Sequence, residues 1–84
     1  MIKCLVFLNG LILIAKIEEI QSELGDPDCK ISDVCVINPD ETIVPWLKFA
    51  ENKDFLVRSE NILTIVDPKS DVIKSYMEII GWKF

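Results

Sequence analysis

The sequence predicts a mostly β fold: a small, strongly bent antiparallel sheet of five or six strands that closes toward a barrel, followed by one α-helix. Up to residue 66, short apolar runs alternate with turn signatures at a spacing of roughly eight to twelve residues. Residues 67–81 instead carry apolar side chains at helical spacing. A chain of 84 residues has room for one domain. We therefore expect a single domain over residues 1–84, with a barrel over residues 1–66 and a helix over residues 67–81.

The first two strands are predicted to form a hairpin. Residues 2–8 are apolar except for Lys3, which is typical of a buried strand. Asn9 and Gly10 follow, and both tolerate the positive φ of a type I′ turn. Residues 11–17 then provide the returning strand.

The returning strand competes with a helix in the local pattern. Apolar residues recur at helical spacing, namely Ile14, Ile17, Ile20 and Leu24, and Gly25 occupies a helix C-cap position. An amphipathic helix over residues 13–24 is therefore as consistent with these residues as a strand is. In the strand interpretation, the change of phase at Glu18 and Glu19 marks a bulge or a sharp bend.

Four further strands are predicted, over residues 30–37, 43–50, 55–58 and 61–66. Turn signatures precede the first three of them, at residues 25–28, 38–41 and 51–54. Pro45 lacks a backbone donor, so its strand is expected at a sheet edge or at a bulge.

The C-terminal helix is predicted from its ends and from its apolar stripe. Asp67 is a candidate N-cap and Pro68 suits the first helical position, while Gly81 provides a stop. The stripe consists of Val72, Ile73, Tyr76, Met77, Ile79 and Ile80. Trp82 and Phe84 are expected to pack onto the domain or onto a neighbouring molecule.

Charge and hydropathy limit the kinds of partner. The formal net charge is −5, the wrong sign for broad attraction to phosphates, so any contact with nucleic acid must be local. Half of the residues are hydrophobic, more than so small a fold buries. Self-association is therefore predicted.

The residues do not indicate a catalytic, metal or disulfide site. The chain has no histidine, so its serines and cysteines lack the usual activating base, and Asp26 and Asp28 lack the further oxygen ligands of a calcium loop. The cysteines are Cys4, Cys29 and Cys35, an odd number without metal-binding spacing. We expect packing thiols, no cofactor, no metal and no enzymatic activity.

The cysteines and the hydropathy also bear on location. Free thiols suggest a reducing cytoplasm. The apolar N-terminal run loosely imitates a signal peptide, but Asn9 and Gly10 interrupt it and no cleavage site follows. No apolar run is long enough to span a membrane. A soluble, cytoplasmic protein is therefore expected.

Two residues are candidates for contact with a ligand. Arg58, the only arginine, lies in the polar break over residues 57–62, between two apolar runs. Binding and a plain surface pairing with Glu60 are equally consistent with its local sequence. Trp46 suits either a base-stacking platform or, more commonly for such a residue, a core or subunit-interface position.

Two segments together resemble the Sm/LSm family of RNA-binding proteins. Leu8, Asn9 and Gly10 after an apolar strand look like the opening strand and turn of that family. Residues 57–62, followed by an apolar strand, look like its second signature: a branched apolar residue, arginine, glycine, two polar residues and an apolar residue. Ser59 stands where glycine is usual. The chain is also similar to a small, phage-like group of Sm-like proteins seen in marine sequences.

The resemblance implies an Sm-like open barrel that assembles into a homo-oligomeric ring. Residues 11–22 would form a bent strand, and the strand over residues 61–66 would pair with the edge of a neighbour's preceding strand. The implied subunit interface comprises Phe55, Val57, Ile62, Leu63, Ile65 and Val66. The pore would be lined by Arg58, Ser59 and Asn61, helped by Lys30 from the facing loop.

The expected function is therefore non-enzymatic binding of single-stranded RNA by a ring, and the sequence does not distinguish RNA from DNA. The first alternative is an acidic protein-interaction module with the same barrel, docking a protein through Trp46, Trp82 or the C-terminal helix. A monomeric α+β domain with a helix over residues 13–24 is the second alternative.

Overall fold

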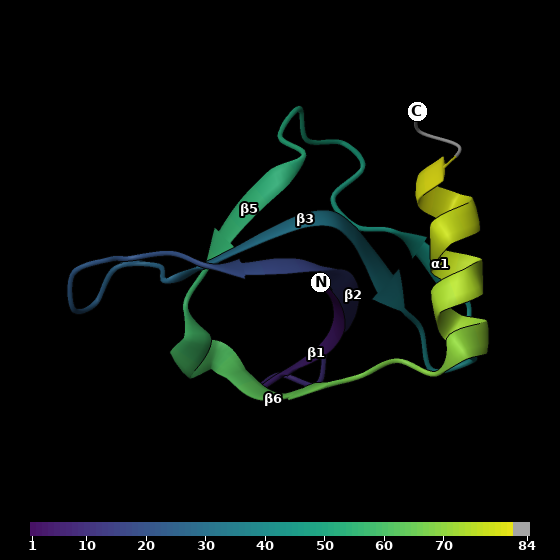
Figure 1. Cartoon of the computed structure of the whole chain (residues 1–84), viewed down its shortest axis with the longest axis horizontal. Helices are drawn as coiled ribbons and strands as arrows, with labels where there is room; N and C mark the ends of the chain where they lie inside the picture. The colour runs from purple at the N-terminus through teal and green to yellow at the C-terminus, as the bar shows by residue number, and fades with distance from the viewer. Residues whose placement is uncertain (82–84) are drawn as a thin grey trace.

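The computed structural model describes residues 1–81 and has the predicted mostly β fold, an open antiparallel sheet of six strands with one C-terminal helix (Figure 1). The elements are β1 Ile2–Phe7, β2 Ile12–Glu19, β3 Cys29–Ile37, β4 Ile43–Pro45, β5 Asp54–Val57, β6 Ile62–Val66 and α1 Ser70–Gly81. The strand order is β4-β3-β2-β1-β6, and β5 also pairs with β3. The expected packing of Trp82 and Phe84 falls outside the described residues.

Both faces of the sheet are covered, which explains the continuous apolar runs. On the face toward α1, the buried cluster is Cys4, Ile14, Cys35, Tyr76 and Ile80. On the opposite face, the bent sheet encloses Leu5, Leu13, Ala15, Ile31 and Val34. Side chains alternate between faces along a strand, so adjacent residues such as Leu13 and Ile14 enter different clusters. All three cysteine side chains are buried, as expected of packing thiols.

The helix considered for residues 13–24 is wrong, and the strand implied by the family resemblance is present. β2 pairs with β1 on one side and with β3 on the other. Apolar residues on both faces of a central strand produced the apparent helical spacing. β2 ends at Glu19, so the expected strand over residues 11–22 is shorter than predicted.

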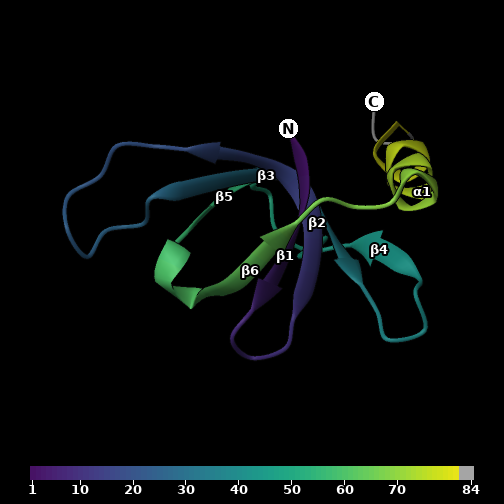
Figure 2. The ribbon, with the colours of Figure 1, turned by 60° about the horizontal axis from the view of Figure 1, so that its bottom comes forward.

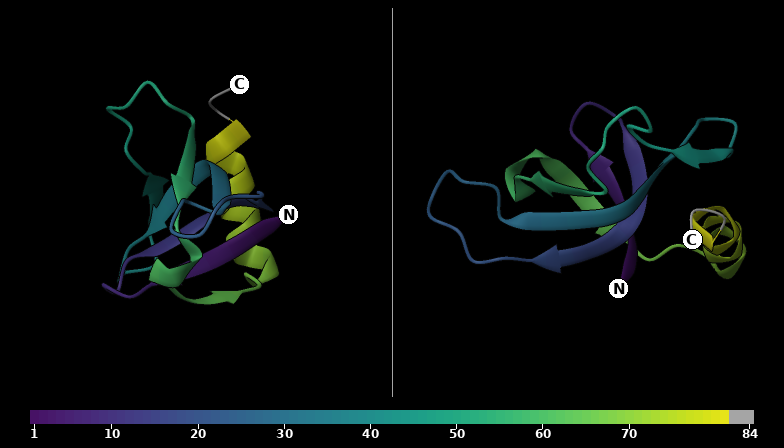
Figure 3. Two further views of the ribbon diagram at one scale, coloured as in Figure 1. Left: turned by 90° about the vertical axis from the view of Figure 1, so that its left-hand side faces the viewer. Right: turned by 90° about the horizontal axis from the view of Figure 1, so that it is seen from above.

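The bend of the sheet lies in the middle of the β2–β3 ribbon rather than at Glu18 and Glu19. The register of the two strands shifts between Ile14 and Lys16, where β3 contains an extra residue. Asp33, at this β-bulge, has a φ of 50°, a left-handed conformation that Asp tolerates better than most residues. The two long strands curve strongly around this point (Figure 3).

The β1–β2 hairpin lies where it was predicted, but its turn is not type I′. The backbone N–H of Phe7 donates to the Leu11 carbonyl (2.8 Å), and the N–H of Gly10 donates to the Phe7 carbonyl (2.9 Å). Gly10 has a φ of 88°, whereas Asn9 is not among the residues with positive φ. This is the three-residue hairpin that ends in a left-handed glycine.

β4 is much shorter than the predicted strand over residues 43–50. The Trp46 N–H still donates to the Val34 carbonyl (3.0 Å), but Leu47, with a φ of 50°, turns the chain away from β3. The chain returns to the same edge of β3 as β5 (Figure 2). Pro45 lies on an edge strand, as its missing donor predicted.

The helix α1 begins three residues later than predicted. The Lys69 carbonyl accepts a hydrogen bond from the Ile73 N–H (3.0 Å), while the Asp67 carboxylate pairs with the Lys3 ammonium. Asp67 is therefore not the N-cap, because its charge is used to hold the segment between β6 and α1 against β1. Tyr76 anchors the helix to the sheet by donating its hydroxyl to the Asp33 carbonyl (2.7 Å).

Candidate functional site

The Arg58 segment forms a short, tightly held turn between β5 and β6. A single 3₁₀ turn spans Ser59–Asn61, and the Asn61 N–H donates to the Arg58 carbonyl (3.1 Å). The Leu8 N–H donates in turn to the Asn61 carbonyl (3.0 Å), which joins this turn to the β1–β2 hairpin. Arg58, Ser59 and Asn61 are thus adjacent on one turn that is hydrogen-bonded to the hairpin.

Asp28 fastens the loop between β2 and β3 to this turn. Its carboxylate accepts hydrogen bonds from the Ser59 backbone N–H (2.7 Å) and from the Ser59 hydroxyl (2.6 Å). These two bonds hold the pKa of Asp28 below its ordinary value of 3.8, and the bond from the hydroxyl has the larger effect. Sequence reasoning considered Asp28 only as a weak cation ligand and missed this contact, because a partner 31 residues away leaves no local signal.

Ser59, which stands where the Sm/LSm signature that this segment resembles has glycine, does not distort the turn. Ser59 is in a 3₁₀ turn, and it is not among the residues with positive φ. A side chain is therefore accommodated without strain. The hydroxyl that glycine would lack is the group that binds Asp28.

Arg58 is held only loosely. Its guanidinium lies 3.6 Å from the Glu60 carboxylate, and its side chain is 51% exposed. The surface pairing considered from the sequence is thus present. An exposed ion pair of this kind contributes about 0–1 kcal/mol, so a ligand could displace Glu60 at little cost.

Arg58 borders two hollows of different character. The acidic hollow, of about 350 Å³, is lined by Arg58 and Ser59 together with Glu23, Asp26, Asp28 and Glu60, and by Ser22, Leu24 and Gly25. The turn hollow, of about 470 Å³, is lined by Arg58, Asn61 and Asn9 and by the apolar groups of Phe7, Leu8, Pro27, Leu56 and Val57. Guanidinium, amide and apolar surface thus converge in the turn hollow.

Lys30 is not brought to this group. It lies in β3 rather than in a loop, opposite Leu56, and its ammonium is 3.5 Å from the Asp54 carboxylate. It lines a separate hollow that also includes Lys16 and Glu18.

The predicted interface residues divide into two groups. Leu63, Ile65 and Val66 are exposed on β6. Phe55, Val57 and Ile62 are instead half-buried and pack against the cluster on the face away from α1.

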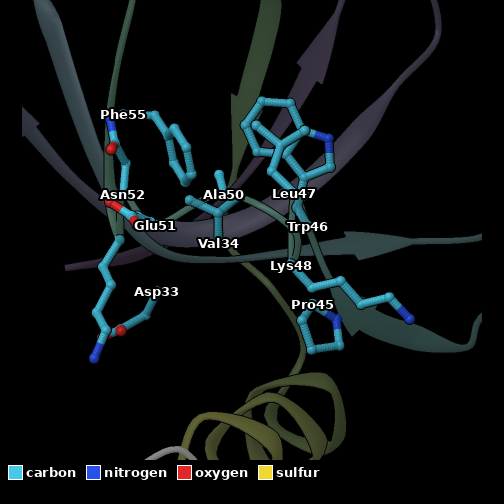
Figure 4. A pocket seen from close by; sticks show the side chains of 11 residues that line it. Asp33, Val34, Pro45, Trp46, Leu47, Lys48, Ala50, Glu51, Asn52 and Phe55 are labelled. Atoms are coloured by element: carbon cyan, nitrogen blue, oxygen red, sulfur yellow. The ribbon is translucent and has the colours of Figure 1, made fainter.

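A further hollow, which we call the aromatic hollow, lies beside the loop that connects β4 to β5 (Figure 4). Trp46 and Phe55 line it, with their ring centroids 5.3 Å apart and their planes at 66°. Trp46 is half-buried and packs against the buried cluster on the face of the sheet away from α1. The interpretation of this residue as a core residue therefore holds in part. The hollow itself left no signal in the sequence, because it arises from the bulge at Asp33 and the early end of β4.

Among residues 1–81, no group of three or more Cys, His, Asp or Glu residues is placed to hold a metal ion. None of the helices in that range is long and apolar enough to cross a membrane.

Comparison with known proteins relates the chain to a family. No curated protein matches the sequence. The model of a family of unknown function, DUF6561, matches residues 1–81, which is nearly the whole chain. The chain therefore belongs to the DUF6561 family.

Proposed function

We propose that this protein is a non-enzymatic, Sm-like protein that assembles into a ring and binds single-stranded RNA through the turn that carries Arg58. The observation that carries the proposal is the junction of three connections of the sheet at the turn that carries Arg58. Asp28 and Ser59 hold the β2–β3 loop against the β5–β6 turn, and the Asn61 carbonyl holds the β1–β2 hairpin there. Three connections of the sheet thus meet at the only arginine.

The free edges of the sheet support self-association. Within residues 1–81, β6 pairs only with β1 and β5 pairs only with β3. Both edges carry exposed apolar side chains, among them Leu63 (66% exposed) and Leu56 (59% exposed). β6 also contains neither a charged residue nor proline, and an apolar edge strand of this kind is a pairing site for another strand. Pairing β6 of one copy with β5 of the next would repeat head to tail and close into a ring.

Assembly would overcome the unfavourable net charge. In a ring, every copy places its turn in an equivalent position, so the arginines would gather within a small space. The guanidinium of Arg58 can stack on a base or bond to it, and the Asn61 amide beside it offers a donor and an acceptor to base edges. The Asn9 side-chain oxygen accepts from the Leu11 N–H (3.0 Å), which leaves its amide nitrogen as a further donor.

The test measures binding of U-rich and A-rich RNA oligonucleotides to wild type, Arg58→Ala and Lys74→Ala at two salt concentrations. Lys74 is exposed on α1, and its replacement removes the same charge far from the turn. We expect Arg58→Ala to lose about tenfold or more in affinity, as stacking and charged contacts of this kind contribute, and Lys74→Ala to bind like wild type. Equal binding by all three proteins, or none by any, would contradict the proposal.

A second candidate function is supported by the acidic hollow. Four carboxylates line it beside Arg58, from Glu23, Asp26, Asp28 and Glu60. Such a surface repels phosphates and suits a basic protein segment. In this case the protein is an interaction module without nucleic acid. A pull-down from a cell lysate with and without nuclease separates the two functions, because only a partner tethered by RNA is lost on digestion.

A further inference from the structure

The aromatic hollow has the size and the wall of a small-molecule site. Its volume is about 360 Å³, within the range of ligand pockets. Val34, Pro45, Ala50 and the two aromatic rings form its apolar surface. In Figure 4 the side chains of Phe55 and Trp46 flank Ala50 and Val34 from either side, and Asp33 and Pro45 lie nearer the helix.

The loop over residues 46–53 holds the hollow open. The Ala50 N–H donates to the Leu47 carbonyl (2.9 Å), and the Trp46 N–H donates to the Val34 carbonyl. Phe49 has the only large aromatic side chain inside this loop besides Trp46, and it is 86% exposed rather than turned into the hollow. The apolar wall therefore stays accessible to a flat ring.

The rim carries both hydrogen-bonding and charged groups. Glu51, Asn52 and Lys48 border the hollow, and Glu51 and Asn52 lie beside Phe55 in Figure 4. The Asp33 carboxylate is already 3.1 Å from the Lys16 ammonium. Glu51 is thus the carboxylate left to accept hydrogen bonds from a ligand.

We propose that the aromatic hollow is a nucleobase site that prefers guanine. A base stacks on the indole of Trp46, as bases do on aromatic side chains in proteins that bind single strands. Guanine presents two adjacent N–H donors, at N1 and N2, to a carboxylate such as that of Glu51. Adenine and cytosine each place an acceptor nitrogen beside their amino group, which the carboxylate repels. Lys48 also lines the hollow, and in Figure 4 its side chain extends away from the rings, so that its ammonium can meet a phosphate outside the hollow.

This site is separate from Arg58 and does not depend on ring formation.

The same base chemistry belongs to a free nucleotide and to a guanine within RNA, and the test separates these sources. Since the chain has two tryptophans, Trp82→Phe leaves Trp46 as the sole indole. The emission of Trp46 then reports on the hollow during titration with GMP, with UMP and with a short G-containing oligonucleotide.

We expect GMP to quench Trp46 saturably and UMP to bind about tenfold more weakly. Ala50→Leu fills the hollow and should abolish the response, whereas Phe49→Ala, in the same loop but outside the hollow, should leave it unchanged. Glu51→Gln should remove the preference for guanine while retaining stacking. Calorimetry of the unmodified chain with GMP provides the same comparison without the Trp82 substitution.

A tighter response to the oligonucleotide assigns the site to RNA, and equal responses assign it to a free nucleotide. The proposal is overturned if no nucleotide changes the emission, if Ala50→Leu binds like Phe49→Ala, or if an aromatic peptide binds where nucleotides do not. Arg58→Ala should retain the GMP response, so failure of the RNA-binding ring and failure of this site give different results.

Discussion

Ser59 and Asp28 are the clearest case in which one side chain determines how two loops meet. The serine contributes both a hydroxyl and a backbone N–H to the same carboxylate. Both donors favour the ionised carboxylate, which is why the pKa of Asp28 is lowered. The stability that Asp28 contributes is therefore present above its ordinary pKa of 3.8 and is lost as the pH falls through its lower pKa in the folded protein.

The first prediction concerns this contact. Ser59→Ala removes the hydroxyl bond, so the pKa of Asp28 should rise toward 3.8, measured by an NMR titration of the carboxyl carbons. Asp40 is a matched control, because the Thr42 hydroxyl and N–H lower its pKa in the same manner in another turn. A change at Asp40, or none at Asp28, would show that the contact does not govern this pKa.

The backbone conformation of single residues could be predicted from the sequence only in part. Left-handed backbone occurs at Gly10, where the sequence indicated it, but also at Asp33, Glu41 and Leu47. Glu41 closes a turn with the hydrogen bonds of the β1–β2 hairpin, without the glycine that makes such a turn recognisable. Tertiary packing imposes these conformations, and the residue types at these positions do not predict them.

At the scale of elements, strand and helix types followed from the pattern, and their ends did not. β2 was recognisable as a strand only through the family resemblance, because a strand buried on both faces loses its alternation. β4 ended early because Leu47 turns the chain away, and α1 began late because Asp67 is used by Lys3. The Arg58 turn was found because it is local, whereas Asp28 and the aromatic hollow depend on contacts between distant segments.

The attachment of α1 to the sheet depends on Tyr76. Its side chain is fully buried and its hydroxyl satisfies the Asp33 carbonyl at the bulge. Burial, helped by the charges of Asp33 and Cys35, raises the pKa of Tyr76 above its ordinary value of 10.0. Its contribution to stability is therefore present below pH 10 and declines as the pH rises further, because the unfolded chain ionises first.

The second prediction tests this attachment. Tyr76→Phe retains the ring but leaves the Asp33 carbonyl without its donor, which should cost about 1–2 kcal/mol in urea unfolding. Ser75→Ala on the exposed face of α1 is the control and should change stability much less. Since Tyr76 is the only tyrosine, tyrosinate absorbance should appear at ordinary alkaline pH only in the unfolded protein. Ionisation at its ordinary pKa in the folded protein would contradict the assigned burial.

At the scale of the whole molecule, the sheet has two ends of unequal character. The strand β4 is three residues long and contains Pro45, so its outer edge is poorly suited to pairing. β6 is apolar and uncharged, and β5 presents Leu56 at the other available edge. The two edges best suited to pairing are thus those that a head-to-tail assembly requires.

A charge on the β6 edge tests the proposed assembly. Leu63→Lys should reduce the mass of the protein in light scattering to that of one chain, because a lysine on an edge strand opposes pairing. Met77→Lys puts the same charge on the exposed surface of α1 and should leave the assembly intact. A wild-type protein that is already monomeric, or a Leu63→Lys protein of unchanged mass, would exclude the proposed edge pairing.

The affinity for RNA should depend on whether the copies are assembled. Leu63→Lys adds a positive charge and leaves Arg58 in place, so simple electrostatics predicts equal or tighter binding of an oligonucleotide. If several arginines around a ring act together, separating the copies should instead weaken binding by about tenfold or more, as loss of multivalency does. Weaker binding despite the added charge would therefore indicate that the RNA site is shared between copies, whereas unchanged binding would assign it to the single turn.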